Sequence, residues 1–361
     1  MRLGTCIALE LAVATAAMGG VWLGTGLAID RAGDYLETRS AAAAPLIQRT
    51  AIEPLPRAEL AVVPSRQSTP DSIYGVDADL LAPVGAAKVT KMKLNHGGTS
   101  LSIRLDFANG SRAAFKPEQT HPQSDPRREL AAYRMDRLLG IGRVQPAKEV
   151  EIPVADLVAA IEPGYRDYIV GRLTEEGIAH GGVYRGVASW WIPEIKLATI
   201  GGLRLDEQPG RELWTAQLQI GAPMTAEYRP MLAQLSACIL FDLLIDNSDR
   251  WSGGNTMMSP DGTQLYFMDN SLSFSKATYG HEQTVLAMRR IQIYPRGLVD
   301  KLRKLTREQI EATLAVAPDS QLGPLIKPIE VTAMLARRDN MLKWIDQLIA
   351  RYGEDVVLAF E

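Results

Sequence analysis

The chain has 361 residues, of which 46% are hydrophobic and 22% are charged, and its formal net charge at pH 7 is -3. These values describe a globular protein long enough for one large or two ordinary domains, and they exclude a mainly disordered chain. The small negative charge, and the lack of a basic run interleaved with aromatic residues, argue against nucleic-acid binding. The two cysteines, Cys6 and Cys238, provide neither a disulfide framework nor a cysteine metal site.

The N-terminus carries a long apolar stretch. From Leu3 to Ile29 the residues are apolar apart from Glu10 and a few Gly and Thr. The stretch exceeds both the roughly 20 residues that span a bilayer and the apolar region of about 7–15 residues in a signal peptide. We therefore predict a signal anchor in residues 1–30, with a signal peptide as the alternative. The body of the protein is then expected on the extracytoplasmic face of a membrane, in the periplasm or the secretory lumen, or secreted after signal cleavage.

A linker is expected to follow in residues 31–72. From Ser40 to Pro70 the sequence is rich in Ala, Pro, Arg, Ser and Thr, and it has no sustained helical or strand-like period. This composition is typical of a flexible or semi-extended segment. Periodic patterns begin beyond it, so residues 73–361 are predicted to form the folded domain.

Two strands around a glycine turn open this domain. Residues 88–94 and 101–107 are predicted strands on either side of Gly97 and Gly98, and apolar residues alternate in the second of them, at 101, 103, 105 and 107. The amide N–H groups of such a turn can close over phosphates. Because most glycine pairs are ordinary turns, both interpretations of Gly97 and Gly98 stay open.

Lys116 is the first charged candidate for a site residue. It ends the next predicted strand, residues 112–116, and its ammonium group leaves a half-buried strand beside the glycine turn. Further along, Glu129 lies in the first turn of a predicted helix. A strand lysine paired with a glutamate on the next helix is the arrangement that holds a phosphate-binding lysine in kinases. The alternative is a solvated lysine at a strand end.

The stretch from Ile239 to Phe274 concentrates acidic and amide side chains. An apolar helix is expected to end near Asp246, and a polar run through Asn247 and Asp249 follows it. One interpretation is that these residues cap the helix. The other is a site for a divalent cation and a proton acceptor, because carboxylate and carboxamide oxygens suit Mg or Mn.

A predicted hairpin follows the acidic loop. Its strands are residues 255–259 and 264–268, and the Pro260-Asp261-Gly262 turn joins them. This hairpin brings Asp269 to the same edge as the acidic loop. Asp269 ends a strongly apolar strand and should lie near the core, where acids usually have a partner or a metal.

The remaining sequence predicts mostly helices. Four of them are expected, at residues 282–288, 298–305, 307–316 and 330–351. The histidines lack metal-ligand spacing, so surface or packing roles are expected for His96, His121, His180 and His281.

Several ordered segments resemble a known family. AAFKPEQ, RRELAAYRMDRLLGIGRVQP, ILFDLLIDNSDR and LYFMDNSLSFS, in this order, are similar to the Golgi secretory-pathway kinases, the family of the Golgi casein kinase and the proteoglycan xylose kinase. HGGVYRGVASWWIPEI resembles the family's lobe-connecting region, and GHEQTVLAMRRIQIYPRGLVDKL resembles the segment after its metal-binding aspartate. The resemblance implies an α+β, atypical protein-kinase-like fold with two lobes. A small β-rich N-lobe is expected at about residues 73–170, and a mainly helical C-lobe at about residues 190–361.

The resemblance also implies roles for individual residues. Asp249 matches the catalytic aspartate that accepts the proton of the substrate hydroxyl, and Asp269 matches the aspartate that holds the metal. Lys116 would bind the nucleotide phosphates, Glu129 would position it or help to hold metal, and Asn255 is the candidate for a second metal ligand. The implied cofactors are ATP and Mg or Mn. The implied partners are a nucleotide and a glycan or protein acceptor, besides a membrane contacted through the N-terminal segment.

The chain departs from the family pattern in ways that keep alternatives open. Trp251 stands where the family usually has histidine, and Asn255 lies six residues beyond Asp249 rather than the five common in kinases. The connection from Lys116 to Glu129 is short, and the absence of stapling cysteine pairs fits a bacterial-type chain. The leading hypothesis is an ATP-dependent atypical kinase that phosphorylates a hydroxyl of a glycan or protein. The alternatives are a nucleotide-binding pseudokinase that scaffolds a partner, and an enzyme that transfers AMP.

A pair of aromatic residues is a further candidate. Trp190 and Trp191 follow the strand-like residues of the expected lobe junction, where large rings can flank adenine. Core packing is the alternative for this pair.

Overall fold

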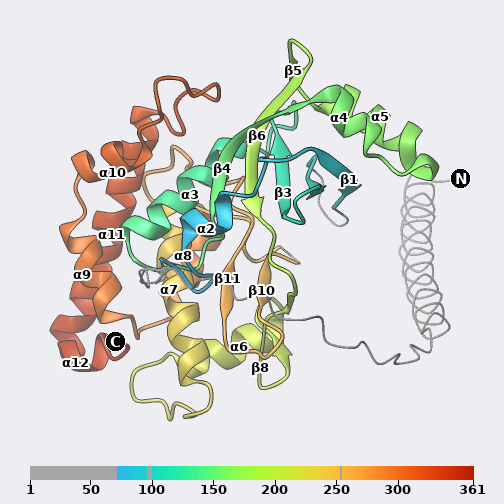
Figure 1. The fold of residues 1–361 in the computed structure, drawn as a ribbon. Helices are drawn as coiled ribbons and strands as arrows, with labels where there is room; N and C mark the ends of the chain where they lie inside the picture. The colour runs from blue at the N-terminus through green and yellow to red at the C-terminus, as the bar shows by residue number, and fades with distance from the viewer. Residues whose placement is uncertain (1–70, 96–99, 253) are drawn as a thin grey trace, which may run out of the picture. The chain divides into compact units, whose positions relative to one another are not determined.

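The computed structural model describes residues 71–95, 100–252 and 254–361 (Figure 1). The predicted anchor or signal peptide, the predicted linker up to residue 70, and both Gly97 and Gly98 lie outside these residues. Within the described part of the chain, no helix is long and apolar enough to cross a membrane.

An antiparallel sheet dominates residues 71–190, which we call the sheet region. Its strands lie side by side in the order β1-β2-β3-β6-β4, and the short strand β5 adds to β6. The bounds are β1 Val89–Leu94, β2 Ile103–Phe107, β3 Arg112–Pro117, β4 Ala147–Pro153, β5 Ala179–His180 and β6 Val183–Trp190. The three strands predicted at the start of the domain are present, and the side chains of β2 are alternately buried and half-buried, as its sequence predicted.

Four short helical elements accompany this sheet, besides helix α3. They are α2 Asp77–Leu81, α4 Val154–Ala159, the 3-10 helix η1 Pro163–Tyr165 and α5 Arg166–Glu176. The segment after α4 returns to the sheet, because the Met92 N–H of β1 donates to the Ala160 carbonyl at 3.0 Å. Ile169 and Leu173 of α5 belong to the same apolar cluster as the inner face of β1 to β3.

Residues 191–361, which we call the helical region, contain seven helices among the described residues. They are α6 Gln208–Gln217, α7 Arg229–Ile245, α8 Glu282–Arg289, α9 Arg296–Lys304, α10 Arg307–Leu314, α11 Pro328–Tyr352 and α12 Glu354–Val357. Their short strands are β7 Lys196–Leu197, β8 Thr199–Ile200, β9 Leu203–Arg204, β10 Thr256–Met258 and β11 Leu265–Phe267. Helix α7 is apolar on nearly every face, so it lies at the centre of this region's core.

Helix α3, Pro126–Leu138, connects the two regions. Figure 1 shows it between the sheet and helices α10 and α11. Its apolar residues Leu130, Ala131 and Met135 pack in the same core cluster as α7. The Asp125 side chain caps its N-terminus by accepting from the Arg127 N–H at 3.0 Å, and Pro126 occupies the first turn, where a missing N–H costs nothing. The predicted helix that carries Glu129 is therefore confirmed.

The acidic stretch also folds as predicted. Helix α7 ends at Ile245, and Asp246 adopts a left-handed conformation with φ of 59° as its C-cap. Strands β10 and β11 pair antiparallel, and the Gly262 N–H donates to the Ser259 carbonyl at 2.8 Å across the turn between them. The hairpin and the helix exit are confirmed. Strand β6 lies beyond residue 170, where the N-lobe was predicted to end, and it is the strand that joins β3 to β4.

Candidate functional site

A cavity of about 480 Å³ lies where the sheet meets the β10-β11 hairpin. Four of the predicted site residues line it, namely Lys116, Glu129, Asn255 and Asp269. The other lining residues described by the structure are Asn95, Ser100, Ser102, Ala114, Gln145, Ser189, Trp190, Trp191, Ile192, Ile195, Gly254, Met257 and Met268. Trp190 and Trp191 therefore lie on its wall, as expected of residues that flank a nucleobase. Asn95 and Ser100 adjoin the predicted phosphate-binding glycine turn.

The ammonium group of Lys116 lies at the centre of the charged end of this cavity. Its Nζ is 2.6 Å from Oε1 of Glu129 and 2.7 Å from Oδ1 of Asp269, and it also donates to the Ser271 hydroxyl at 3.2 Å. Burial alone would lower the pKa of Lys116, but the two carboxylates outweigh it and raise this pKa above its ordinary value. Lys116 is therefore a permanent cation, held on β3 by one acid from α3 and one from the loop after β11.

Glu129 bonds both to Lys116 and to the loop that contains Asp269. Its Oε1 binds Lys116, and its Oε2 accepts the backbone N–H of Asn270 at 3.1 Å. It is buried in the first turn of α3, where the helix dipole favours a negative side chain. Because one carboxylate bonds the strand lysine and the loop of Asp269, the position of α3 sets the distance between these two groups.

Asp269 has a strained backbone conformation, and its carboxyl group has a lowered pKa. It is a non-glycine residue with φ of 50°, and this left-handed conformation is uncommon outside glycine and concentrated at functional sites. Burial by itself would raise the pKa of its carboxyl, but the Lys116 ammonium, with hydrogen bonds from Lys116 and Ser271, lowers this pKa to about 2. The carboxylate is thus available as an anion throughout the physiological pH range.

This lowered pKa predicts how stability depends on pH. Because the unfolded chain protonates the Asp269 carboxyl near pH 4 and the folded protein only near pH 2, the carboxylate stabilises the fold above about pH 4. We expect the stability advantage of the wild type over Asp269→Asn to shrink as the pH falls from about 4 toward 2. Urea unfolding midpoints at pH 5.5, 4.0 and 3.0 measure it. The exposed Asp79→Asn variant on α2 is the control, and a pH-independent advantage would contradict the prediction.

Asn255 and Asp249 form a hydrogen-bonded pair beside the cavity. The Asn255 amide donates to Oδ2 of Asp249 at 2.8 Å and to the Asp249 carbonyl at 3.0 Å. The Asp249 N–H in turn donates to Asn247 at 3.2 Å, and the Ser252 hydroxyl donates to its other carboxylate oxygen. Asp249 does not itself line the cavity, but it is hydrogen-bonded to Asn255, which does.

The oxygen atoms at the charged end fit a divalent cation bound together with phosphates. Among the described residues, Oδ2 of Asp269 and Oδ1 of Asn255 accept no hydrogen bond from the protein. No group of three or more His, Cys, Asp or Glu side chains in this part of the chain forms a complete metal cage. Mg is typically held by one or two carboxylates while phosphate and water oxygens complete its shell, so an incomplete oxygen set suits it. Asp269 and Asn255 could therefore each supply an oxygen ligand to such a metal.

Arg250 is a site residue that the sequence reasoning missed. Its side chain is fully buried, and it donates to Asp242 of α7 at 3.0 Å, to the Asn255 carbonyl at 3.2 Å and to the Asn270 side chain at 3.0 Å. A further bond reaches the Met268 carbonyl. One guanidinium therefore joins the acidic loop, the hairpin and the Asp269 loop to the core helix. The sequence feature that could have identified Arg250 is Asp242, because an acid on the buried face of a helix requires a partner.

A second missed arginine fixes α3 to the helical region. Arg128, the neighbour of Glu129, binds both carboxylate oxygens of Glu330 on α11, at 2.7 and 3.1 Å. Its guanidinium also lies over the Phe274 ring, 5.9 Å from the centroid. This bidentate contact to a buried carboxylate restrains the helix that carries Glu129.

The remaining acids and Trp251 have structural roles. The carboxylate of Asp246 accepts from the His281 N–H at 2.6 Å and from the Thr284 hydroxyl at 3.2 Å, so it caps helix α8. Asp261 accepts from the Thr263 N–H at 3.1 Å within the hairpin turn. Trp251 is buried and stacks on Trp214 of α6, with ring centroids 5.7 Å apart. The tryptophan that replaces the family's usual histidine therefore packs in the core.

Comparison with known proteins shows similarity in sequence to a protein kinase. No protein-family model matches the chain. The chain is 20% identical over 323 residues to the extracellular serine/threonine protein kinase FAM20C of Homo sapiens, and the match covers 76% of this chain and 54% of that protein. The chain thus spans about half the length of this curated relative.

Solved structures of similar fold include two of the Golgi casein kinase and one of hydra Fam20. The crystal structure of the Golgi casein kinase matches with a TM-score of 0.60 and 16% identity over 78% of each chain, and its complex with Mn/ADP matches with 0.60 and 15% over the same shares. The structure of hydra Fam20 with sugar matches with a TM-score of 0.57 and 16% identity, over 79% of this chain and 91% of that one. These findings confirm the predicted kinase-like α+β fold and the resemblance to the Golgi secretory-pathway kinases.

Proposed function

We propose that this chain, which resembles the Golgi secretory-pathway kinases in sequence and fold, is an atypical kinase that transfers the γ-phosphoryl group of ATP to a hydroxyl. One observation carries the proposal: Lys116 lies between the carboxylates of Glu129 and Asp269 at one end of a cavity whose wall includes Trp190 and Trp191. The cation can bind the phosphates of a nucleotide, and the carboxylate and amide oxygens can bind its metal. The aromatic rings of the same cavity can flank its base.

The residues divide the work of phosphoryl transfer. Lys116 would bind the nucleotide phosphates, and Glu129 would orient Lys116. Asp269 and Asn255 would hold Mg or Mn, which supplies neutralisation of the phosphate charge. Asp249 would accept the proton of the attacking hydroxyl, while the Asn255 amide keeps its carboxylate oriented. Such a site works by positioning and charge stabilisation, so it needs no covalent nucleophile.

A glycan or a protein is the proposed acceptor. The relatives support both classes by their names, since one is a serine/threonine protein kinase and another was solved with a sugar. Assays should therefore pair oligosaccharides and serine-containing peptides with ATP labelled in the γ-phosphate. Mass spectrometry of the product separates phosphoryl transfer from AMP transfer. The proposal is wrong if the purified protein with Mn or Mg neither hydrolyses ATP nor transfers phosphate and Asp249→Ala behaves identically.

Nucleotide binding tests Lys116 directly. We expect Lys116→Met to weaken ATP binding about 10–100-fold, because it removes a charge-assisted hydrogen bond to phosphate. Lys148→Met is the matched control, since Lys148 is a half-buried lysine that lines a different cavity. Thermal-shift or calorimetric titration with ATP and Mn measures both, and circular dichroism confirms their folding. Equal ATP affinity in the Lys116→Met variant would remove the phosphate role of this lysine.

The geometry favours catalysis over the pseudokinase alternative. That alternative was motivated by Trp251 and by the displaced Asn255. Trp251 packs against Trp214, and Asn255 contacts Asp249 despite the extra residue between them. Neither departure from the family pattern therefore moves apart the residues that we propose carry out phosphoryl transfer. ATP binding without turnover on any acceptor would favour the pseudokinase.

We also propose that residues 1–30 place the kinase on an extracytoplasmic membrane face. The support is the apolar sequence of this segment and the similarity to an extracellular kinase. A C-terminal alkaline phosphatase fusion tests this placement, because the disulfides that its activity requires form only outside the cytoplasm. Equal phosphatase activity of the full chain and of a variant lacking residues 1–30 would contradict it.

A further inference from the structure

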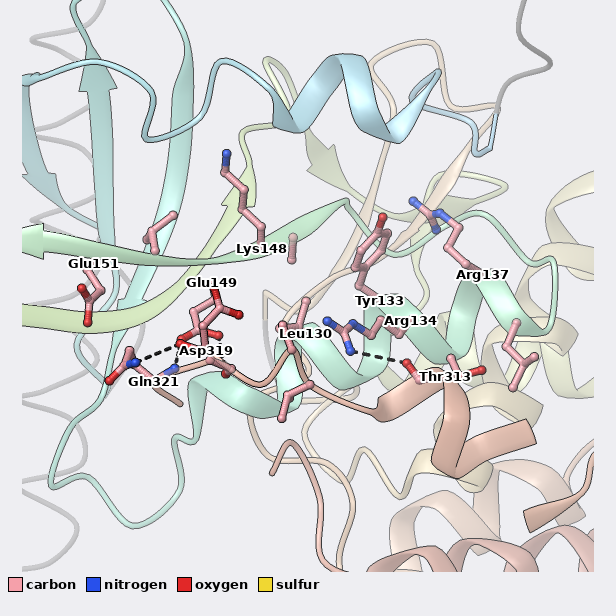
Figure 2. A pocket seen from close by; sticks show the side chains of 16 residues that line it. Leu130, Tyr133, Arg134, Arg137, Lys148, Glu149, Glu151, Thr313, Asp319 and Gln321 are labelled. Carbon is pink, nitrogen blue, oxygen red and sulfur yellow. Dashed lines mark hydrogen bonds between the residues drawn. The ribbon is translucent and has the colours of Figure 1, made fainter. Parts of the chain in front are cut away.

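A second cavity, of about 850 Å³, lies on another face of α3 (Figure 2). The helix contributes one stripe of side chains to it, spaced three and four residues apart: Leu130, Tyr133, Arg134, Arg137 and Leu138. Five consecutive residues of β4, from Ala147 to Glu151, form a second wall, and residues between Thr313 and Gln321 form a third. Because the cavity follows β4 over five residues, it is a groove along a strand.

The strand that lines this groove is the edge of the sheet. In the strand order β4 pairs with β6 on one side and has no strand on the other, within the described residues. The Trp190 N–H donates to the Pro146 carbonyl at 2.8 Å, and this bond sets the alternation of the β4-β6 ladder. Lys148 and Val150 therefore direct their backbone groups toward β6. Ala147, Glu149 and Glu151 direct theirs outward, to the free edge.

Charged side chains extend from both sides of β4. Figure 2 shows Lys148 on one side of the strand and Glu149 and Glu151 on the opposite side. Glu149 accepts from the Ser320 hydroxyl at 2.6 Å and from the Gln321 N–H at 2.7 Å, so it fixes the third wall in place. Lys148 has no hydrogen-bond or ion-pair partner among the residues that the structure describes, and burial lowers its pKa.

We propose that the free edge of β4 binds an extended segment of a partner protein, which adds to the sheet as a further strand and places an acidic side chain beside Lys148. A row of outward N–H and C=O groups at every second residue is complementary to the main chain of another strand. The acidic side chain supplies the partner that Lys148 lacks. This interaction surface does not depend on the proposed kinase activity.

The same geometry disfavours a second copy of this chain as the occupant. In the registers that pair most of β4 with its own copy, centred on Glu149, Val150 or Glu151, a glutamate lies opposite a glutamate. Like charges directly opposite each other destabilise a strand pair. A heterologous segment can instead present small or neutral residues opposite the glutamates. It would also contact Leu130, the neighbour of Glu129 on α3.

A proline substitution on the free edge tests the proposal. Because the Glu151 N–H points away from the ladder, Glu151→Pro removes an edge donor without breaking a bond to β6. Glu151→Ala is the matched control, since it loses the same contact to Arg185 but keeps the N–H. A displayed library of ten-residue peptides with a central aspartate, selected on the full chain, provides the probes. Unfolding midpoints of both variants confirm that they fold.

Selected peptides are expected to bind the wild type and Glu151→Ala alike and to bind Glu151→Pro at least about tenfold more weakly, an effect close to one lost hydrogen bond. Hydrogen exchange should show new protection of the Glu149 and Glu151 amides when peptide is bound. Three results would overturn the proposal: no enrichment of any peptide, enriched peptides that bind Glu151→Pro as tightly as wild type, or self-association of the protein that Glu151→Pro abolishes. The last result would assign the edge to a second copy.

Discussion

Replacing Asp249 with asparagine is expected to lower kcat for phosphoryl transfer by about 10²–10⁴-fold, the usual contribution of a general base. Asparagine keeps the size of the side chain and an oxygen that accepts the Asn255 amide, so the loop should keep its conformation. Asp249 does not line the cavity, and the affinity for ATP should therefore stay near the wild-type value. Steady-state kinetics with labelled ATP, together with calorimetric ATP titration, measure both quantities.

The control for this prediction is another acid of the same stretch. The Asp261 carboxylate accepts hydrogen bonds from Thr263 within the hairpin turn, and it does not contact Lys116. Asp261→Asn should therefore keep kcat within about twofold of the wild-type value. If Asp249→Asn turns over as fast as the wild type, Asp249 is not the base. A parallel loss of ATP affinity would point instead to a structural role for the carboxylate.

The largest effect on stability is expected for Arg250→Leu. This change leaves the Asp242 carboxylate buried without its cationic partner, and removing one member of a buried ion pair costs about 3–5 kcal/mol. It also removes the contacts that join the acidic loop to the Asn255 carbonyl and the Asn270 side chain. We expect the urea midpoint to fall sharply and kcat to fall with it.

Two further variants separate stability from positioning. In Arg250→Leu/Asp242→Leu no buried charge is left unpaired, so part of the lost stability should return while kcat stays low. Arg296→Leu removes an arginine whose partners, Glu354 and Asp355, are exposed, and it should cost no more than about 1 kcal/mol. If the double variant regains full activity, Arg250 does not position the site.

Local patterns predicted the elements that carry the site. The strand that carries Lys116, the helix that begins just before Glu129 and the hairpin that ends before Asp269 were all predicted from periodic apolar residues and turn residues. Asp246 is also the C-cap of α7, and Asp261 bonds within the hairpin turn, as their positions indicated. These features depend on residues a few positions apart. The roles of Asp249 and Asn255 came from family resemblance, and they stay predictions until turnover is measured.

The contacts that assemble the site were beyond such patterns. Arg250 reaches Asn270, 20 residues away, and Arg128 reaches Glu330, 202 residues away. No period or motif in the sequence states which arginine meets which acid, because that choice depends on how separate elements pack. The same holds for Ser271, which bonds both Lys116 and Asp269.

The sequence by itself determined which residues are available for the chemistry and which local element holds each of them. The tertiary structure decided that Glu129 and Asp269 share one lysine, that Arg250 joins three loops to α7, and that β4 is left as an open edge. The physical reason is the range of the interactions. Propensity, capping and turn geometry act over a few residues, whereas ion pairing and strand order are settled when distant segments exclude water together.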